Sequence, residues 1–166
     1  MSKETKSVSK KDDIGIKSTN RKKVADSLNQ LLADEMLLYT KTRKFHWNVV
    51  GPQFHDLHLF LEKQYDELAL IVDAVAERVR KVGYFATGSM KQFLADASLK
   101  ENLEAGGIKI GMLQELITDH DTVIRNLRGL IDMFDEECED AGSADFVTGL
   151  VEKHEKMAWM LRSTLS

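Results

Sequence analysis

One uninterrupted stretch between Pro52 and Gly83 constrains the fold of this chain more than any other feature. The thirty residues from 53 to 82 contain neither proline nor glycine. Their apolar residues recur at helical spacing: Phe54, Leu57, Leu61, Leu68, Ile71, Val75 and Val79. Pro52 suits the first turn of a helix, where its missing N–H costs nothing. We therefore predict one long helix over about residues 53–82.

Helical periodicity also extends over residues 21–48, over residues 108–137 and from Gly142-Ser143 to the C-terminus, with a single proline in the whole chain. Ser143 is the expected N-cap of the last helix, with Asp145 in its first turn. The long connection at 83–107 contains Ser89-x-x-Gln92, a capping-box pattern that predicts a short helix. The sequence therefore predicts an all-α fold: a four-helix bundle with a short extra helix between helices two and three.

The chain divides into a basic tail and an acidic body. Residues 1–20 are Lys- and Ser-rich without helical periodicity, so we expect a flexible tail, followed by one bundle domain at 21–166. Residues 1–23 carry net +5, whereas the remainder carries net −9. A basic arm on an acidic body is typical of a nucleic-acid-binding tail, although a solubilising tail has the same composition. The candidate DNA-binding residues are Lys3, Lys6, Lys10, Lys11 and Lys17.

Nothing in the sequence predicts membrane insertion or secretion. No apolar run approaches the length of a membrane span, and the N-terminus lacks the apolar core of a signal peptide. The only cysteine, Cys138, lies between Glu137 and Glu139, which disfavours a reactive thiolate. We expect a cytoplasmic protein.

Five potential metal ligands lie in and just before the predicted long helix. They are His46, His58, Glu62, Asp73 and Glu77. At 100° per residue, the last four share one helical stripe about 100° wide. Imidazole and carboxylate donors together suit iron, manganese or zinc. The sequence therefore predicts a metal site on this stripe.

One chain cannot close such a site, because Glu62 and Asp73 are separated by about 16 Å along the helix axis. The two ligand pairs, 58 with 77 and 62 with 73, are symmetric about the midpoint of Glu67 and Leu68. An antiparallel copy of the helix crossing there would place His58 opposite the partner's Glu77 and Glu62 opposite the partner's Asp73. A two-fold dimer provides this arrangement and creates two equivalent sites.

Two other interpretations of the histidines are a di-iron site inside one bundle and burial in the core. A di-iron site inside one bundle needs Glu-x-x-His motifs, and no histidine here has glutamate three residues before it. A single histidine on a helix is more often a hydrogen-bonded core residue, which is what we expect of His120, and we expect His154 to pack in the bundle rather than to take part in chemistry. The symmetric spacing of four ligands, with His46 upstream, favours a metal site at the dimer interface.

The same segment resembles the Dps family, the mini-ferritins known as DNA-binding proteins of starved cells. The matching residues are His46-Trp47-Asn48-Val49, Gly51, Phe54, Leu57-His58, Glu62, Tyr65, Glu67, Asp73 and Ala76-Glu77-Arg78. The resemblance implies a ferritin-like fold and a homo-oligomer, in which two-fold dimers assemble into a dodecameric shell. It also implies that both histidines and Glu62 come from one subunit and the Asp-x-x-x-Glu pair from its mate. Some members have Asp where this chain has Glu62, whose longer side chain is still expected to reach the metal.

The resemblance further implies ferroxidase activity and iron storage. Ferrous iron would be oxidised at di-iron sites, with hydrogen peroxide preferred to oxygen, and stored as ferric mineral, which protects DNA. Trp47 is expected to relay an oxidising equivalent, to anchor the core, or both. In the family, the junction after an acidic run such as 132–140, with six acids in nine residues, lines pores through which iron enters. Asp140 and Asp145 are the pore candidates.

Two alternatives remain open from the residues. The protein could act mainly as a DNA-compacting shell through its basic tail. It could also be a helical oligomer whose sites hold zinc or manganese, since the ligand set tolerates several metals.

Overall fold

The fold is entirely helical. The structure is a computed structural model that describes residue 7, residues 14–103 and residues 109–165. Its elements are α1 (Ser18–Asn48), α2 (Phe54–Lys81), α3 (Met90–Asp96), α4 (Lys109–Asp132), the π-helical turn η1 (Met133–Glu137) and α5 (Ala141–Leu165). The predicted four-helix bundle with a short extra helix is confirmed. No helix in the described ranges has both the length and the apolar character needed to span a membrane.

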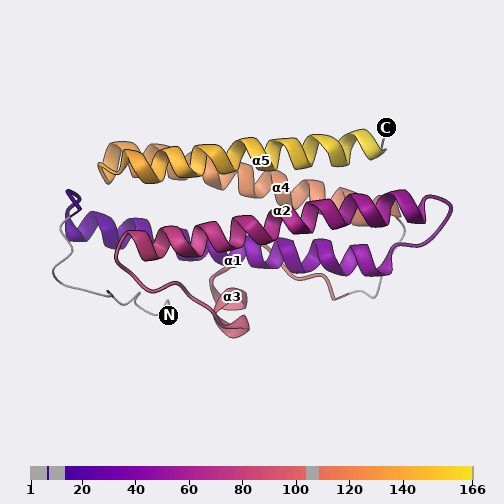
Figure 1. Cartoon of the computed structure of the whole chain (residues 1–166), viewed down its shortest axis with the longest axis horizontal. Coiled ribbons are helices and arrows are strands. Elements are labelled where there is room, and N and C mark those ends of the chain that lie inside the picture. Colours follow the sequence, from indigo (N-terminus) through magenta and orange to yellow (C-terminus); the bar gives the residue numbers. More distant parts are fainter. Residues whose placement is uncertain (1–6, 8–13, 104–108, 166) are drawn as a thin grey trace.

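The four long helices form two antiparallel pairs. In Figure 1, α1 and α2 are joined by a short turn at one end of the bundle, whereas α4 and α5 are joined at the other end. The connection that carries α3 returns the chain along the bundle, so α2 and α4 run in the same direction. This topology places residues 46 and 58 together at the α1–α2 turn.

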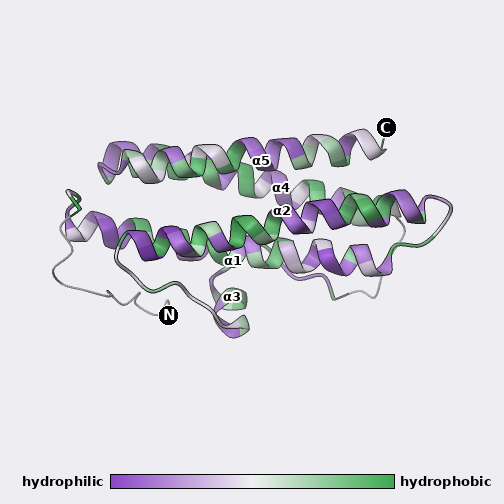
Figure 2. Ribbon diagram, in the orientation of Figure 1, coloured by the Kyte–Doolittle hydropathy of each residue, from purple (hydrophilic) through white to green (hydrophobic). Residues whose placement is uncertain are grey.

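The core lies where the apolar stripes of the helices meet. Figure 2 shows hydrophobic residues alternating with hydrophilic ones along each long helix, as expected of amphipathic helices. The largest fully buried side chains come from all four long helices and from η1: Phe45, Phe134, Leu28, Leu32, Leu38, Leu61, Leu68, Ile71, Leu113, Leu116, Leu127 and Leu161. Of the apolar residues that predicted α2, all but the 44% exposed Phe54 lie on its buried face.

The turn between α4 and α5 is closed by Asp140. Glu139 adopts a φ of 56°, the left-handed conformation that commonly ends a helix. Asp140 Oδ1 then accepts the backbone N–H of Ser143 at 3.0 Å, and Oδ2 accepts the Ser143 hydroxyl at 2.6 Å. The prediction that Ser143 caps α5 is wrong: the helix begins at Ala141, and Asp140 is the N-cap because its longer acceptor side chain reaches the free amide.

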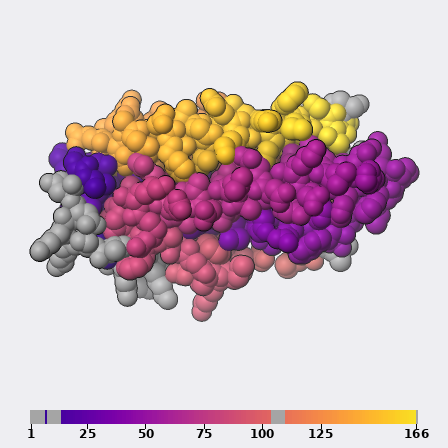
Figure 3. Space-filling model, viewed as in Figure 1, coloured from indigo at the N-terminus to yellow at the C-terminus, as the bar shows by residue number. Residues whose placement is uncertain are grey.

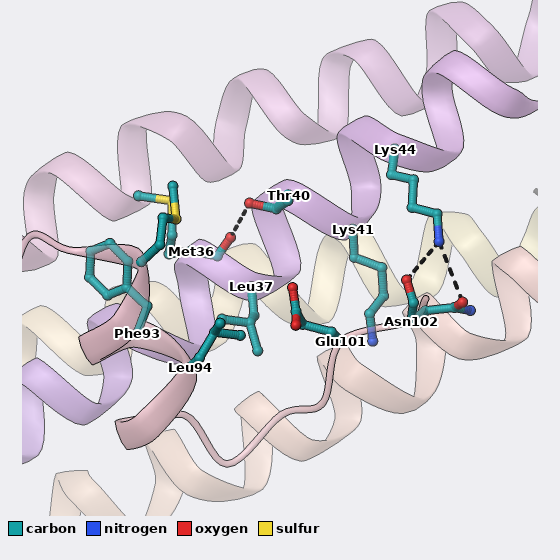
Figure 4. A pocket seen from close by; sticks show the side chains of 10 residues that line it. Met36, Leu37, Thr40, Lys41, Lys44, Phe93, Leu94, Glu101 and Asn102 are labelled. Atoms are coloured by element: carbon teal, nitrogen blue, oxygen red, sulfur yellow. Dashed lines mark hydrogen bonds between the residues drawn. The ribbon is translucent and has the colours of Figure 1, made fainter. Parts of the chain in front are cut away.

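The connection between α2 and α4 is tied to α1 by side chains. Asp34 accepts hydrogen bonds from the backbone N–H groups of Ser98 at 2.6 Å and Leu99 at 2.9 Å. The predicted short helix is present and Ser89 is its N-cap, since Ser89 Oγ accepts from the Gln92 N–H at 3.4 Å. Figure 4 shows the cavity of about 240 Å³ that remains between α1, α3 and the following segment. It is lined by Met36, Leu37, Thr40, Lys41, Lys44, Met90, Phe93, Leu94, Glu101 and Asn102.

The first helix begins at Ser18, three residues before the predicted start of the bundle. Its N-terminal end contacts the acidic α4–α5 turn. Asn20 Nδ2 donates to the Cys138 carbonyl at 3.0 Å, and Lys23 forms an ion pair with Glu137. Hydrogen bonding to Glu137 raises the pKa of Lys23. These contacts hold the start of α1 at the end of the bundle where α4 and α5 are joined.

Candidate metal centre

Two histidines meet at the α1–α2 turn. The His46 and His58 rings stack with centroids 3.7 Å apart and an interplanar angle of 22°. His46 Nδ1 lies 2.8 Å from the His58 carbonyl oxygen, and His58 Nδ1 lies 2.9 Å from the His46 carbonyl oxygen. A carbonyl only accepts, so both Nδ1 atoms carry hydrogen. In the neutral rings this leaves the Nε2 lone pairs of both histidines available to a metal.

The turn between the helices brings the two rings together. The last turn of α1 carries His46, and the chain then reverses through Gly51, whose φ of 111° excludes most side chains. The Gly51 carbonyl accepts the Phe54 N–H at 3.0 Å, which starts α2 one turn before His58. The Phe54 ring packs beside His58, with centroids 5.0 Å apart. The short turn therefore fixes both imidazoles in one orientation.

The carboxylates divide into two groups along α2. Glu62 lies one turn after His58 and is half-buried, whereas Asp73 and Glu77 are exposed further along the helix. Glu77 pairs only with Lys81, at 3.1 Å. In the part of the chain that the structure describes, no three His, Cys, Asp or Glu side chains are arranged to hold a metal. Within one chain, therefore, His46 and His58 lie apart from Asp73 and Glu77.

An arginine surrounded by aromatic rings borders the histidine pair. The Arg43 guanidinium carbon lies 5.8, 5.5 and 5.2 Å from the ring centroids of Tyr39, Trp47 and Tyr65. Tyr65 also contacts His46 edge-on, with centroids 5.1 Å apart. Burial raises the pKa of Tyr65, and the nearby Glu62 raises it further. The site is therefore bordered by oxidisable rings around a fixed positive charge.

Sequence reasoning identified Trp47 but missed its neighbours. Trp47 is 63% exposed, so it does not anchor the core of the chain. That expectation is wrong because Trp47 lies in the last turn of α1, on the face opposite the bundle interior. Arg43 and Tyr39 precede His46 by one and two helical turns, and Tyr65 follows Glu62 by three residues. This helical spacing was the signal that could have found them.

The two pore candidates lie in different surroundings. Asp140 is 3% exposed, caps α5, and pairs with Arg78 Nη2 at 3.3 Å. Asp145 is exposed near the start of α5, just after its first turn. A pore role for either residue remains a prediction. Of the two, only Asp145 presents a carboxylate to solvent.

The tail lysines fall mostly outside the described residues. Lys3, Lys6, Lys10 and Lys11 lie there, and Lys17 pairs with Glu139 at 3.2 Å. Both members of that pair are well exposed, so the pair contributes at most about 1 kcal/mol to stability. Lys17 can therefore exchange Glu139 for another anion at small cost.

The histidines expected in the core are buried, but they lack full hydrogen bonding. His120 and His154 are both 0% exposed, and their Nδ1 atoms lie 3.0 Å apart. Both are therefore core residues as expected, but the Nε2 atom of each has no hydrogen-bond partner, although His154 Nε2 lies 2.9 Å from Glu35 Oε1. Burial lowers the pKa of His120 well below 6.5, with further lowering from His154 and Arg162. Helical periodicity in the sequence predicts that these histidines are buried, but it does not predict that they contact each other.

Comparison with known proteins places the chain in a family. A model of the ferritin-like domain matches residues 25–166. The DNA protection during starvation protein 2 of Bacillus anthracis is 34% identical over 145 residues, covering 87% of this chain and 98% of that protein. A Dps crystal structure from Bacillus brevis is 32% identical, with a TM-score of 0.85, covering 91% of this chain and 100% of that one. The chain belongs to the Dps family.

Other relatives extend this comparison. A low temperature-induced protein of Nostoc, described as uncharacterised, is 49% identical over 151 residues, covering 91% of this Dps chain and 84% of the relative. The Dps structure from Vibrio cholerae O1 is described as a ferritin-like diiron-carboxylate protein. It is 29% identical, with a TM-score of 0.87, and covers 93% of this chain and 96% of that one. The Dps fold therefore spans nearly the whole described bundle.

Proposed function

We propose that this Dps protein oxidises ferrous iron at sites shared across a two-fold subunit interface and stores the ferric product in a hollow shell. The observation that carries the proposal is the division of ligands within one chain. Stacked His46 and His58 offer two Nε2 lone pairs at one end of α2, whereas Asp73 and Glu77 are exposed beyond the midpoint of the same helix. A two-fold axis near Glu67 and Leu68 joins the complementary halves.

The ligands have separate roles in this reaction. His46 and His58 bind the first ferrous ion as neutral nitrogen donors, held in place by their Nδ1–H bonds to backbone carbonyls. Glu62 and the partner's Asp73 and Glu77 supply the negative charge that stabilises iron as its own charge rises. Carboxylates can bind one metal or bridge two, so the set accommodates a pair of ions.

Hydrogen peroxide is the proposed oxidant. Two ferrous ions each give one electron, the O–O bond of peroxide breaks, and two protons complete two water molecules. Hydrolysis of the two ferric ions to mineral then releases protons, four for each peroxide consumed overall. Paired ions matter because a single ferrous ion would split peroxide by one electron and release a hydroxyl radical. Trp47, next to His46 and beside Arg43, is proposed to take up a stray oxidising equivalent.

Stoichiometric oxidation of ferrous iron tests the proposal. We expect purified protein to consume about one peroxide for every two ferrous ions, faster with peroxide than with oxygen, and without hydroxyl-radical adducts in a spin-trap assay. Zinc binding without iron oxidation would instead favour the alternative of a zinc or manganese oligomer. Iron oxidation no faster than in buffer would contradict the proposal.

DNA binding is the second proposed function, and the charge distribution favours it. The acidic body should repel phosphate, so binding would depend on residues 1–23, which carry net +5. Many tails on one shell would add their weak affinities by multivalency. We expect deletion of residues 1–16 to abolish the shift of DNA in a gel, while ferrous iron oxidation stays at the parent rate. The deletion ends before Ser18, where α1 begins.

Salt dependence provides the control for this second function. Binding through lysine–phosphate contacts should weaken steeply between low and physiological salt because counterions are released. Parent protein that leaves DNA unshifted even at low salt would rule out the DNA-compacting function and leave the iron proposal intact.

A further inference from the structure

Polar side chains from all four long helices meet in the interior of the bundle. They are Glu35 of α1, Gln64 of α2, His120 of α4 and His154 of α5; Gln64 is 3% exposed and the others are 0% exposed. Both carboxylate oxygens of Glu35, Oε1 of Gln64 and Nε2 of each histidine are buried without a hydrogen-bond partner. Each such group costs about 1–3 kcal/mol if nothing else satisfies it. Most other described buried polar side chains are paired, so this cluster needs an explanation.

Glu35 and His154 lie at the spacing of two ligands on one metal. His154 Nε2 is 2.9 Å from Glu35 Oε1, yet the two atoms are not aligned for a hydrogen bond. Two bonds of about 2.1 Å at a right angle place their donor atoms about 2.9–3.0 Å apart. Because the two atoms are not aligned for a hydrogen bond, their separation fits two adjacent ligands at a right angle on one six-coordinate ion.

His120 fixes the orientation of His154 from the other side of the ring. The two Nδ1 atoms lie 3.0 Å apart, with one donating and the other accepting. When His154 Nδ1 carries the hydrogen, its Nε2 presents a lone pair toward Glu35. A second-shell partner of this kind fixes the tautomer and raises the basicity of a ligating imidazole. His120 is thus a positioning residue.

We propose that the bundle interior holds a second metal site, which binds one first-row divalent cation through Glu35 and Nε2 of His154. His120 positions His154, and water completes the coordination. Among the described residues no set of three potential ligands is arranged to hold a metal, so this site has two side-chain ligands. The charge of the cation would offset that of a carboxylate that otherwise lies in a low-dielectric core with only a histidine beside it, at 2.9 Å. Mixed nitrogen and oxygen donors suit zinc, iron or manganese.

A groove between α2 and α5 leads toward this cluster. Figure 3 shows α5 lying along α2 on one face of the molecule, and a groove of about 490 Å³ lies between these two helices. It is lined by Phe60, Lys63, Gln64, Glu67, Lys153, Lys156, Met157 and Met160. At its base, Gln64 Nε2 donates to the Met157 carbonyl at 3.2 Å, and Met157 lies one turn from His154.

The interior site is separate from the interface site. It uses none of the interface ligands, and it needs no partner subunit. It also lacks the Glu-x-x-His motif of a di-iron bundle site, because Arg43, Pro52, His55, Ile117 and Val151 precede the five histidines by three residues. Metal binding at the interior site can therefore be measured in a variant whose interface site has lost its two histidine ligands.

The test uses a His46→Ala/His58→Ala background, in which His55, His120 and His154 are the remaining histidines. We expect equilibrium dialysis against zinc to leave about one ion per chain and cobalt to give an absorption band typical of an imidazole-bound ion. Adding the near-isosteric Glu35→Gln should remove that ion and the band. Adding His55→Ala, which changes an exposed histidine on α2, should leave both unchanged.

A crystal structure of the background variant soaked in zinc gives a direct answer that does not depend on the folding of Glu35→Gln. We expect an anomalous peak at the zinc edge between Glu35 and His154. Ordinary water density there without an anomalous signal would overturn the proposal, as would a zinc content that Glu35→Gln leaves unchanged. Neither result depends on ferroxidase activity.

Discussion

Protein made only of His58→Ala chains, and protein made only of Asp73→Ala chains, should each oxidise ferrous iron at least about 100-fold more slowly than the parent. Loss of a second-shell partner alone costs about 10–100-fold at metal sites, and these residues are proposed to bind iron directly. Asp73 is exposed and His58 is half-buried at the end of the bundle, so neither change should unfold the chain. The rate of ferric absorbance after peroxide addition measures the effect.

Two matched variants control for the change of charge and the loss of a ring. His55→Ala and Asp66→Ala remove an exposed histidine and an exposed acid from α2, close to the ligands in sequence. Both should oxidise iron at the parent rate. Parent-like rates in His58→Ala or in Asp73→Ala would refute the ligand assignment.

Asp140→Ala should lower the free energy of unfolding by about 2–4 kcal/mol, because the aspartate is both a helix cap and a charged hydrogen-bond acceptor. Its carboxylate accepts from the Ser143 backbone and hydroxyl and pairs with Arg78. Removal leaves the Ser143 N–H with only its 3.1 Å bond to the backbone carbonyl of residue 140, and it takes one acceptor each from the buried Ser143 hydroxyl and the Arg78 guanidinium. Denaturant unfolding followed by circular dichroism measures the loss.

Asp145→Ala is the matched control for Asp140. It removes an acid of the same size from the same end of α5, but this acid is exposed and is not the cap of the helix. We expect it to lower the unfolding free energy by less than about 1 kcal/mol. Slower iron uptake by Asp145→Ala at parent stability would support its role in a pore. Equal stability losses in the two variants would contradict the capping function of Asp140.

The features that sequence predicted well depend on local periodicity and steric rules. The uninterrupted stretch after Pro52 became α2, and the Ser89-x-x-Gln92 pattern became the capped start of α3. Both follow from backbone geometry within a few residues. The resemblance to the Dps family was also carried by a contiguous segment, and the family comparison confirmed it.

The features that sequence missed depend on contacts between distant residues. Asp140 caps α5 in place of Ser143, and its orientation depends on Arg78 of α2, 62 residues away. The pairing of Glu35 with His154 joins α1 to α5, so helical spacing could place each residue inward without showing that they meet. A core anchor was one of the two roles expected of Trp47, whereas its position at the end of α1 leaves it 63% exposed.

Co-refolding the two inactive variants tests the shared interface site most directly. In a mixed dimer of His58→Ala and Asp73→Ala chains, one site receives both damaged halves and the other receives both intact halves. Random pairing makes about half the dimers mixed, so about a quarter of the parent sites should be restored. We predict ferrous iron oxidation at about a quarter of the parent capacity. Activity no higher than that of the separately refolded variants, with mixed dimers confirmed by mass, would contradict the shared site.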